Sequence, residues 1–194
     1  MNDIQPLPGA GRVFPPAPSM LSVRPELSSA VADREFVFDG GPVWAAERAL
    51  DIAARNGVEQ LVPAERLGLQ AAMRPPSQDW LVDRLSILWT QFMVARQADP
   101  RALAVWMAET GSLLGDLPHD IVAHAIDQAV RKSRHGFIPS VGEIRQFADP
   151  LVEERERQIE RLTAMETAMA DPVATAARME RRAATAAAQE GRRA

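Results

Sequence analysis

Apolar residues recur at helical spacing through the central part of the chain, between residues 77 and 149. In the first stretch the apolar positions stand three or four apart, at Leu81, Leu85, Leu88 and Phe92, and Trp89 and Met93 widen the stripe. Positions with this spacing share one face of a helix. The pattern therefore predicts an amphipathic helix that begins after Ser77, which suits the N-cap position.

Two further helices are expected before residue 136. Asp99-Pro100 suits a helix start, and apolar residues follow at Leu103, Trp106, Met107, Leu113 and Leu114. The next helix has its buried face at Ile121, Val122, Ala125, Ile126, Ala129 and Val130. Acidic Asp120 lies near its start and basic residues near its end, as the helix dipole favours. Gly136 is expected to end it.

The stretch "RHGFIPSVGEIRQFADP", residues 134–150, combines a basic turn, an aromatic residue, a proline and a helix cap. Ser140 and Glu143 stand in the S-x-x-E arrangement of a capping box, which predicts a helix start. We expect Phe137 and Ile138 to enter the core between the two helices. On this interpretation Pro139 and the capping box hold the turn in shape.

The flanks of this region differ from it in composition. Residues 1–42 hold seven of the fifteen prolines and show no sustained apolar period, which predicts a disordered arm. Pro42 and Gly57 suit the start and the end of an Ala-rich helix, and a shorter helical piece starts near Pro63. After Pro150 the chain is dense in charge and then rich in Ala and Arg. We expect residues 150–194 to form a projecting helix that frays into a basic tail.

The pattern as a whole predicts an all-α protein, because no segment shows the alternation of a strand. We expect a helical bundle of four or five helices at residues 43–149. A disordered Pro-rich arm, residues 1–42, would precede it, and a long charged helix with an Ala/Arg-rich tail, residues 150–194, would follow.

Composition narrows the surroundings of the protein. The chain has 194 residues, a net charge of −4 and no cysteine, which argues against a uniformly basic surface and fits a reducing compartment. No window offers the roughly 20 uninterrupted apolar residues of a membrane span. The first residues lack a signal-peptide pattern. We therefore expect a cytoplasmic protein that does not contact a membrane.

Motifs for catalysis are absent from the sequence. There is no G-x-x-x-x-G-K-[ST] phosphate loop, no G-x-S-x-G nucleophile turn and no Gly-rich dinucleotide turn. His119 and His124 are five residues apart, so they do not form an i, i+4 metal pair, although Asp120 and Asp127 flank His124. We expect no catalytic residues, no metal and no cofactor, and hence a protein that is not an enzyme.

Two surfaces remain as candidate binding sites. The first is a basic cluster that could meet phosphates or acidic side chains of a partner: Arg131, Lys132, Arg134, His135 and Arg145. The alternative for this cluster is favourable charge at a helix end. The second is a thin apolar stripe that could pair with a partner helix or with its own copy: Ile159, Leu162, Met165 and Met169. The alternative for this stripe is packing on the core of its own chain.

The run from Trp106 to Pro150 joins a tryptophan, an "LPHDIVAHA" helix, a basic turn and the step "FIPSVGEI". This order resembles small all-helical phage replication proteins, the helicase loaders or loader/inhibitor proteins. The replication protein of lambda-like phages has a similar F-x-P-S step. The resemblance implies a helical domain that recruits a replicative helicase, a flexible segment that contacts it, and no ATPase site. No catalytic residues carry over, and the Pro-rich arm and the Arg/Glu-rich helix have no counterpart.

Three functions stay open at this stage. The first is a replication adaptor that binds a replicative DNA helicase, as loader or inhibitor. The second is a phage structural or assembly protein that self-associates through the C-terminal helix. The third is direct DNA binding through the basic turn or the Arg-rich tail. The sequence names neither the partner nor the oligomeric state.

Overall fold

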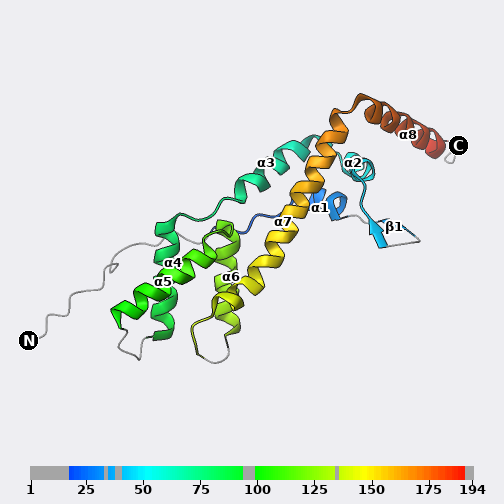
Figure 1. The fold of residues 1–194 in the computed structure, drawn as a ribbon. Helices are drawn as coiled ribbons and strands as arrows, with labels where there is room; N and C mark the ends of the chain where they lie inside the picture. Colours follow the sequence, from blue (N-terminus) through cyan, green and yellow to red (C-terminus); the bar gives the residue numbers. More distant parts are fainter. Residues whose placement is uncertain (1–17, 33–34, 38–40, 94–98, 134–135, 191–194) are drawn as a thin grey trace, which may run out of the picture. The chain divides into compact units, whose positions relative to one another are not determined.

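The computed structural model (Figure 1) describes residues 18–32, 35–37, 41–93, 99–133 and 136–190. The fold is all-α, as expected. The described ranges contain the α-helices α1 (Pro25–Ala32), α2 (Ala46–Arg55), α3 (Val62–Ala72), α4 (Gln78–Met93), α5 (Pro100–Leu114), α6 (His119–Lys132), α7 (Val141–Ala170) and α8 (Pro172–Glu190). A short 3-10 helix, η1 (Glu59–Leu61), precedes α3.

One small feature departs from the expected absence of strands. Strands β1 (Glu35–Val37) and β2 (Gly41–Val43) pair antiparallel, with Glu35 opposite Val43 and Val37 opposite Gly41. Pro42 therefore lies in β2, and the prediction that it begins a helix is wrong. Three residues per strand are too few for an alternating pattern to show in the sequence.

The helix boundaries predicted from local signals are confirmed at three positions. The Trp80 backbone N–H donates to Ser77 Oγ at 3.3 Å, and the Arg101 N–H donates to Asp99 Oδ1 at 3.0 Å, so both residues cap helices. Gly57 directly follows the C-cap of α2 with φ +70°. Helix α6 instead ends at Lys132 with Ser133 as its C-cap, so the prediction that Gly136, with φ +64°, ends this helix is wrong. Glycine adopts such positive φ values without the strain that a Cβ would add.

The chain divides into two compact units, each of which is described separately. The middle unit comprises Pro75–Ala148 together with Met1–Met20, and the terminal unit comprises Leu21–Arg74 together with Asp149–Ala194. These units differ from the expected domains in that residues 43–74 separate from Pro75–Ala148 and join the C-terminal segment. The C-terminal segment belongs with α1, α2 and α3, because it supplies part of their core.

The middle unit has its core between α4, α6 and the first turns of α7. The side chains that are buried there are Leu81, Leu85, Leu88, Leu114, Leu117, Ile121, Val122, Ala125, Ile126, Ala129, Ile144 and Ala148. On α5, in contrast, Leu114 is the one large apolar residue that is buried, while Val105 and Leu113 are more than half exposed. Helix α5 thus covers the core on a narrow face and leaves apolar side chains at the surface.

The terminal unit has a second core, and the N-terminal segment contributes to it. Leu27 and Ala30 of α1 have no exposed surface, and they pack with Leu50 of α2 and Val62 of α3. The prediction that residues 1–42 form a disordered arm is therefore wrong for α1. It is also wrong for residues 35–37 and 41–42, which lie in the hairpin, while residues 1–17, 33–34 and 38–40 of the predicted arm lie outside the described residues. The helix was missed because its buried face holds only three residues in a Pro-rich setting.

The apolar stripe of the C-terminal helix lies in this same core. Leu162 and Met165 are fully buried, and Ile159 and Met169 are partly buried and pack against the same cluster. The prediction that this stripe is a free surface for a partner helix is wrong, and so is the prediction that the helix projects. The stripe is thin because only one side of α7 faces α1, α2 and α3, and polar residues cover the rest.

Two arginines of α8, in the Arg-rich tail, form ion pairs with acidic residues of the same unit. Arg178, which is 3% exposed, lies 3.4 Å from Glu59, and Arg182 lies 3.1 Å from Glu59 and 3.5 Å from Asp51. The sequence made these arginines candidates for DNA binding, but their charges are paired with acidic side chains of the same unit. Residues 191–194, with the last two arginines, lie outside the described residues.

Arg155 is a buried cation that joins three segments of the terminal unit. Its side chain is 3% exposed, and it donates to the carbonyl oxygens of Leu21 at 2.9 Å and of Ala72 at 3.2 Å. Ala72 is the last residue of α3, where helix carbonyls have no partner within the helix. Arg155 thus connects the start of the unit, the end of α3 and the middle of α7.

Helix α7 continues through Pro150, although the sequence suggested a boundary there. A proline inside a helix lacks the N–H that would bond to the carbonyl four residues earlier. The two units divide between Ala148 and Asp149, directly beside this proline. The helix therefore loses one hydrogen bond at the point where it passes from one unit to the other.

None of the helices in the described part of the chain combines the length and the apolar character needed to cross a membrane.

The buried position of Leu162 predicts a large effect on stability. Replacing Leu162 by Ala should lower the free energy of unfolding by about 2–5 kcal/mol, because it removes buried methyl groups and leaves a cavity. The matched control is Met179→Ala, at a position in α8 that is 59% exposed. Urea unfolding followed by circular dichroism measures both, and a free partner-binding stripe would instead leave Leu162→Ala as stable as the control.

The hydrogen bonds of Arg155 predict that the terminal unit depends on this side chain. Arg155→Ala removes the guanidinium that donates to the Leu21 and Ala72 carbonyl oxygens, and a hydrogen bond from a charged group contributes about 1.5–3 kcal/mol. Arg157→Ala is the control, because Arg157 is more exposed and pairs with Glu154 three residues away, a contact worth less than about 1 kcal/mol. Equal urea midpoints for the two variants would contradict the assigned role.

Candidate partner-binding site

The turn between α6 and α7 is held by hydrogen bonds at both of its ends. At the end of α6 the Ser133 N–H donates to the Val130 carbonyl oxygen, and Ser133 Oγ donates to the Phe137 carbonyl oxygen at 3.2 Å. Gly136, in the left-handed region, reverses the chain between them. The turn therefore has a defined backbone path where the structure describes it.

The capping box predicted at the start of α7 is confirmed. The Glu143 N–H donates to Ser140 Oγ at 3.2 Å, and the Ser140 N–H donates to Glu143 Oε2 at 2.8 Å. Ser140 Oγ also lies 2.8 Å from Glu143 Oε2. This reciprocal bonding satisfies N–H groups that the first turn of a helix leaves without partners.

Phe137 lies at the surface, which contradicts the prediction that it enters the core. Its side chain is 68% exposed, the highest exposure of the large apolar residues around this turn. Ile138 is half-buried and Pro139 is buried, so these residues anchor the turn to the unit. The chain direction after Gly136 turns Pro139 inward and leaves Phe137 outside. An exposed aromatic residue on a fixed turn is available as a contact for a partner.

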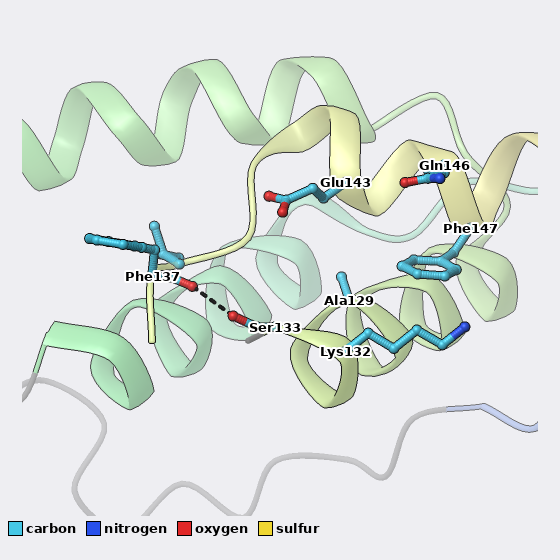
Figure 2. Close-up of a pocket in the computed structure, with 8 residues that line it drawn as sticks. Ala129, Lys132, Ser133, Phe137, Glu143, Gln146 and Phe147 are labelled. Carbon is cyan, nitrogen blue, oxygen red and sulfur yellow. Dashed lines mark hydrogen bonds between the residues drawn. The ribbon is translucent and has the colours of Figure 1, made fainter. Parts of the chain in front are cut away.

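An open pocket of about 300 Å³ lies beside Phe137. Figure 2 shows Phe137 and Phe147 at opposite ends of this pocket. Glu143 and Gln146 of α7 lie along one side, and Ala129, Lys132 and Ser133 from α6 and its C-cap lie along the other. The pocket can take an apolar side chain between the two aromatic rings, with charged groups of both signs at its edge.

The basic cluster is only partly assembled in the structure. Arg131 and Lys132 are exposed at the end of α6, and Lys132 Nζ lies 4.7 Å from the centre of the Phe147 ring. This distance fits a cation–π contact, which holds the ammonium group at the pocket. Arg134 and His135 lie outside the described residues.

Arg145 contacts a different part of the middle unit. Its guanidinium donates to the Leu113 carbonyl oxygen at 2.8 Å and 3.0 Å and forms an ion pair with Asp116. Both partners belong to the end of α5 and the loop that follows. These contacts of Arg145 tie α7 to the end of α5, and its place in the basic cluster stays a prediction.

His119 and the carboxylates near His124 have partners that are not metal ligands. His119 packs edge-on against Trp80, with ring centroids 4.2 Å apart, and Asp127, near His124 in sequence, forms an ion pair with Arg84. Asp120 accepts a hydrogen bond from the Ile121 N–H at 3.0 Å. Among the residues that the structure describes, no three His, Asp or Glu side chains gather as metal ligands.

Two features of this site are not predicted by the sequence. The apolar pattern places Phe137 in the core, and it does not indicate a contact between Lys132 and Phe147. Phe147 stands fifteen residues after Lys132, so nothing in the local pattern joins the two. Nothing in the local pattern separates exposed Phe137 from half-buried Ile138 and buried Pro139.

Comparison with known proteins found no family model that matches the chain, and no similar curated protein or solved structure.

The capping box predicts a measurable contribution to stability. Ser140→Ala should lower the free energy of unfolding by about 0.5–2 kcal/mol, the usual range for loss of an N-cap side chain. Ser112→Ala, at an exposed position on α5, should change it by less than about 0.5 kcal/mol. A double-mutant cycle of Ser140→Ala with Glu143→Ala, measured by urea unfolding, should show coupling, and strict additivity would contradict reciprocal bonding.

Proposed function

We propose that this chain is a non-catalytic replication adaptor that binds a replicative DNA helicase, as loader or inhibitor, through the turn between α6 and α7. The observation that carries the proposal is Phe137, 68% exposed on a turn held by the Ser133 hydrogen bond and by the capping box. Large aromatic residues held in a fixed position supply much of the binding energy at protein interfaces. A cytoplasmic location would agree with this role.

The proposal has a second line of support in the sequence. The F-I-P-S-x-x-E-I step, by which the chain resembles phage helicase loaders, is the same segment that forms the exposed turn. Its Pro139 is buried and its Ser140 and Glu143 form the cap, so these residues shape the surface that Phe137 presents. The residues of the resemblance and the residues of the site coincide.

The chemistry of the pocket indicates the kind of helicase segment that would bind. A partner's apolar side chain would enter between Phe137 and Phe147, where it loses contact with water. An acidic group beside it would meet Lys132 and Arg131 at the end of α6, where the basic charges are exposed. An exposed helix or loop with an apolar residue next to an acid meets both requirements.

The two other functions that the sequence left open lose part of their support, while DNA binding through the basic turn stays a prediction because Arg131 and Lys132 are exposed. Self-association through the C-terminal stripe would need Leu162 and Met165 at the surface, and both are buried. DNA binding through the Arg-rich tail would use Arg178 and Arg182, which instead contact Glu59. The turn between α6 and α7 remains as the surface with an exposed aromatic residue and exposed cations.

A pair of variants tests the proposed binding surface. Phe137→Ala should weaken binding to the hexameric replicative helicase of the native host by at least about tenfold, as expected for a central aromatic contact. The control is Val105→Ala, because Val105 is 56% exposed on α5 and lies outside the pocket. Isothermal titration calorimetry with purified helicase measures both affinities, and circular dichroism checks that both variants are folded.

Two outcomes would refute the proposal. In the first, affinity purification of the full chain from its native host, followed by mass spectrometry, recovers no replication protein. In the second, the helicase binds Phe137→Ala as tightly as the unchanged protein. A loss of affinity in Val105→Ala with none in Phe137→Ala would move the binding surface to α5.

A further inference from the structure

A second open pocket, distinct from the one beside Phe137, lies between α4 and α5. Its volume is about 730 Å³, within the range of pockets that take ligands or side chains. We call it the α4–α5 groove. It is lined mainly by apolar or small residues, namely Pro76, Gln78, Leu81, Val82, Met107, Ala108, Gly111, Ser112 and Gly115.

The walls of this groove suit a flat apolar side chain. Gly111 and Gly115 leave its floor without side chains, and a Cβ at Gly115 would lie 2.9 Å from the Gly111 carbonyl oxygen. Met107 is flexible and adapts to the shape of a bound group. Val82 is 42% exposed, so an apolar group in the groove would remove that surface from water.

The N-terminal segment is long enough to reach this groove from Leu21, where it joins α1 and its unit. Arg155 holds the Leu21 and Ala72 carbonyl oxygens on one guanidinium group, so these two points of the chain are neighbours. Pro76, in the groove wall, follows Ala72 by four residues, which span at most about 14 Å. Phe14 precedes Leu21 by seven residues, which span up to about 25 Å. The span of seven residues exceeds that of four, so chain length alone allows Phe14 to reach the groove.

The composition of that segment matches the groove. Residues 1–17 lie outside the described residues, and they contain the apolar pair Val13-Phe14 followed by Pro15-Pro16. Prolines restrict the unbound chain, so an extended segment loses less conformational entropy when it binds. Arg12 directly precedes the pair.

We propose that the α4–α5 groove is the binding site for the N-terminal segment of the same chain, with Phe14 as the inserted side chain. The segment closes the apolar surface that α4 and α5 leave open. This binding is independent of the helicase contact, because the groove shares no residue with the pocket beside Phe137.

The absence of cysteine from the chain allows a direct test by disulfide formation in the full-length protein. The test variant carries Arg12→Cys with Ser112→Cys, which places one thiol next to Phe14 and one in the groove wall. The control variant carries Arg12→Cys with Leu113→Cys. Leu113 adjoins Ser112 in sequence and is 51% exposed, but it lies about 100° further round the helix and does not line the groove.

We expect the intramolecular disulfide to form at least about tenfold faster in the Ser112→Cys variant than in the Leu113→Cys variant. A tethered but unbound segment reaches millimolar effective concentration at both positions, so it gives similar rates. Adding Phe14→Ser to the test variant should remove the difference. Similar rates in the two variants, no dependence on Phe14, or disulfides between two copies would each overturn the proposal.

Limited proteolysis supplies a second readout without cysteines. Trypsin cleaves after Arg12, and a segment held in the groove is a poorer substrate than a free one. We expect cleavage at Arg12 to be about tenfold slower in the unchanged chain than in Phe14→Ser or in Val82→Asp, which places a charge in the groove. Equal cleavage rates in all three proteins would overturn the proposal. Neither readout involves the helicase, so each can fail or succeed independently of the proposed function.

Discussion

The terminal unit depends on one constraint, the burial of the Arg155 guanidinium. A buried cation is tolerated only where hydrogen bonds replace the water it has lost. Arg155 donates to carbonyl oxygens at the start of the unit and at the end of α3, so three segments far apart in sequence must meet around it. The contacts of Arg155 keep α7 against α1, α2 and α3, which buries Leu162 and Met165. They also place Leu21, where the N-terminal segment ends, near Ala72.

The middle unit combines a rigid core with two open surfaces, and the same helices supply both. Helix α6 is buried along most of its length, so the helix that precedes the turn is fixed in the core. The Ser133 hydrogen bond and the capping box then hold Phe137 outside the core. Helix α5 buries much less of its apolar surface, which leaves the α4–α5 groove open. A fixed aromatic residue and an apolar groove are different binding features, and we assign them to different partners.

Local chemistry accounts for the parts of the fold and of the site that the sequence predicted correctly. Ser77, Asp99 and Gly57 mark helix ends in the structure because their roles depend on bonds or φ angles within a few residues. The Ser140–Glu143 box is confirmed for the same reason. The sequence did not predict the short hairpin or α1, because each has too few residues for a periodic pattern. Pro150 did not end its helix, since the loss of one hydrogen bond is outweighed by packing on both sides.

The sequence by itself determined the all-α class, the starts of α4, α5 and α7, and the apolar faces of α4, α6 and α7. Tertiary structure alone decided what each face meets. The stripe of Leu162 and Met165 could serve a partner or its own core, and contacts with residues more than a hundred positions away made it core. Phe137 could point in or out, and the burial of Pro139 left it outside. Arg145 contacts Asp116 and Leu113, which no local pattern indicates. A periodic pattern records which residues avoid water, whereas the identity of the covering surface depends on how distant segments pack.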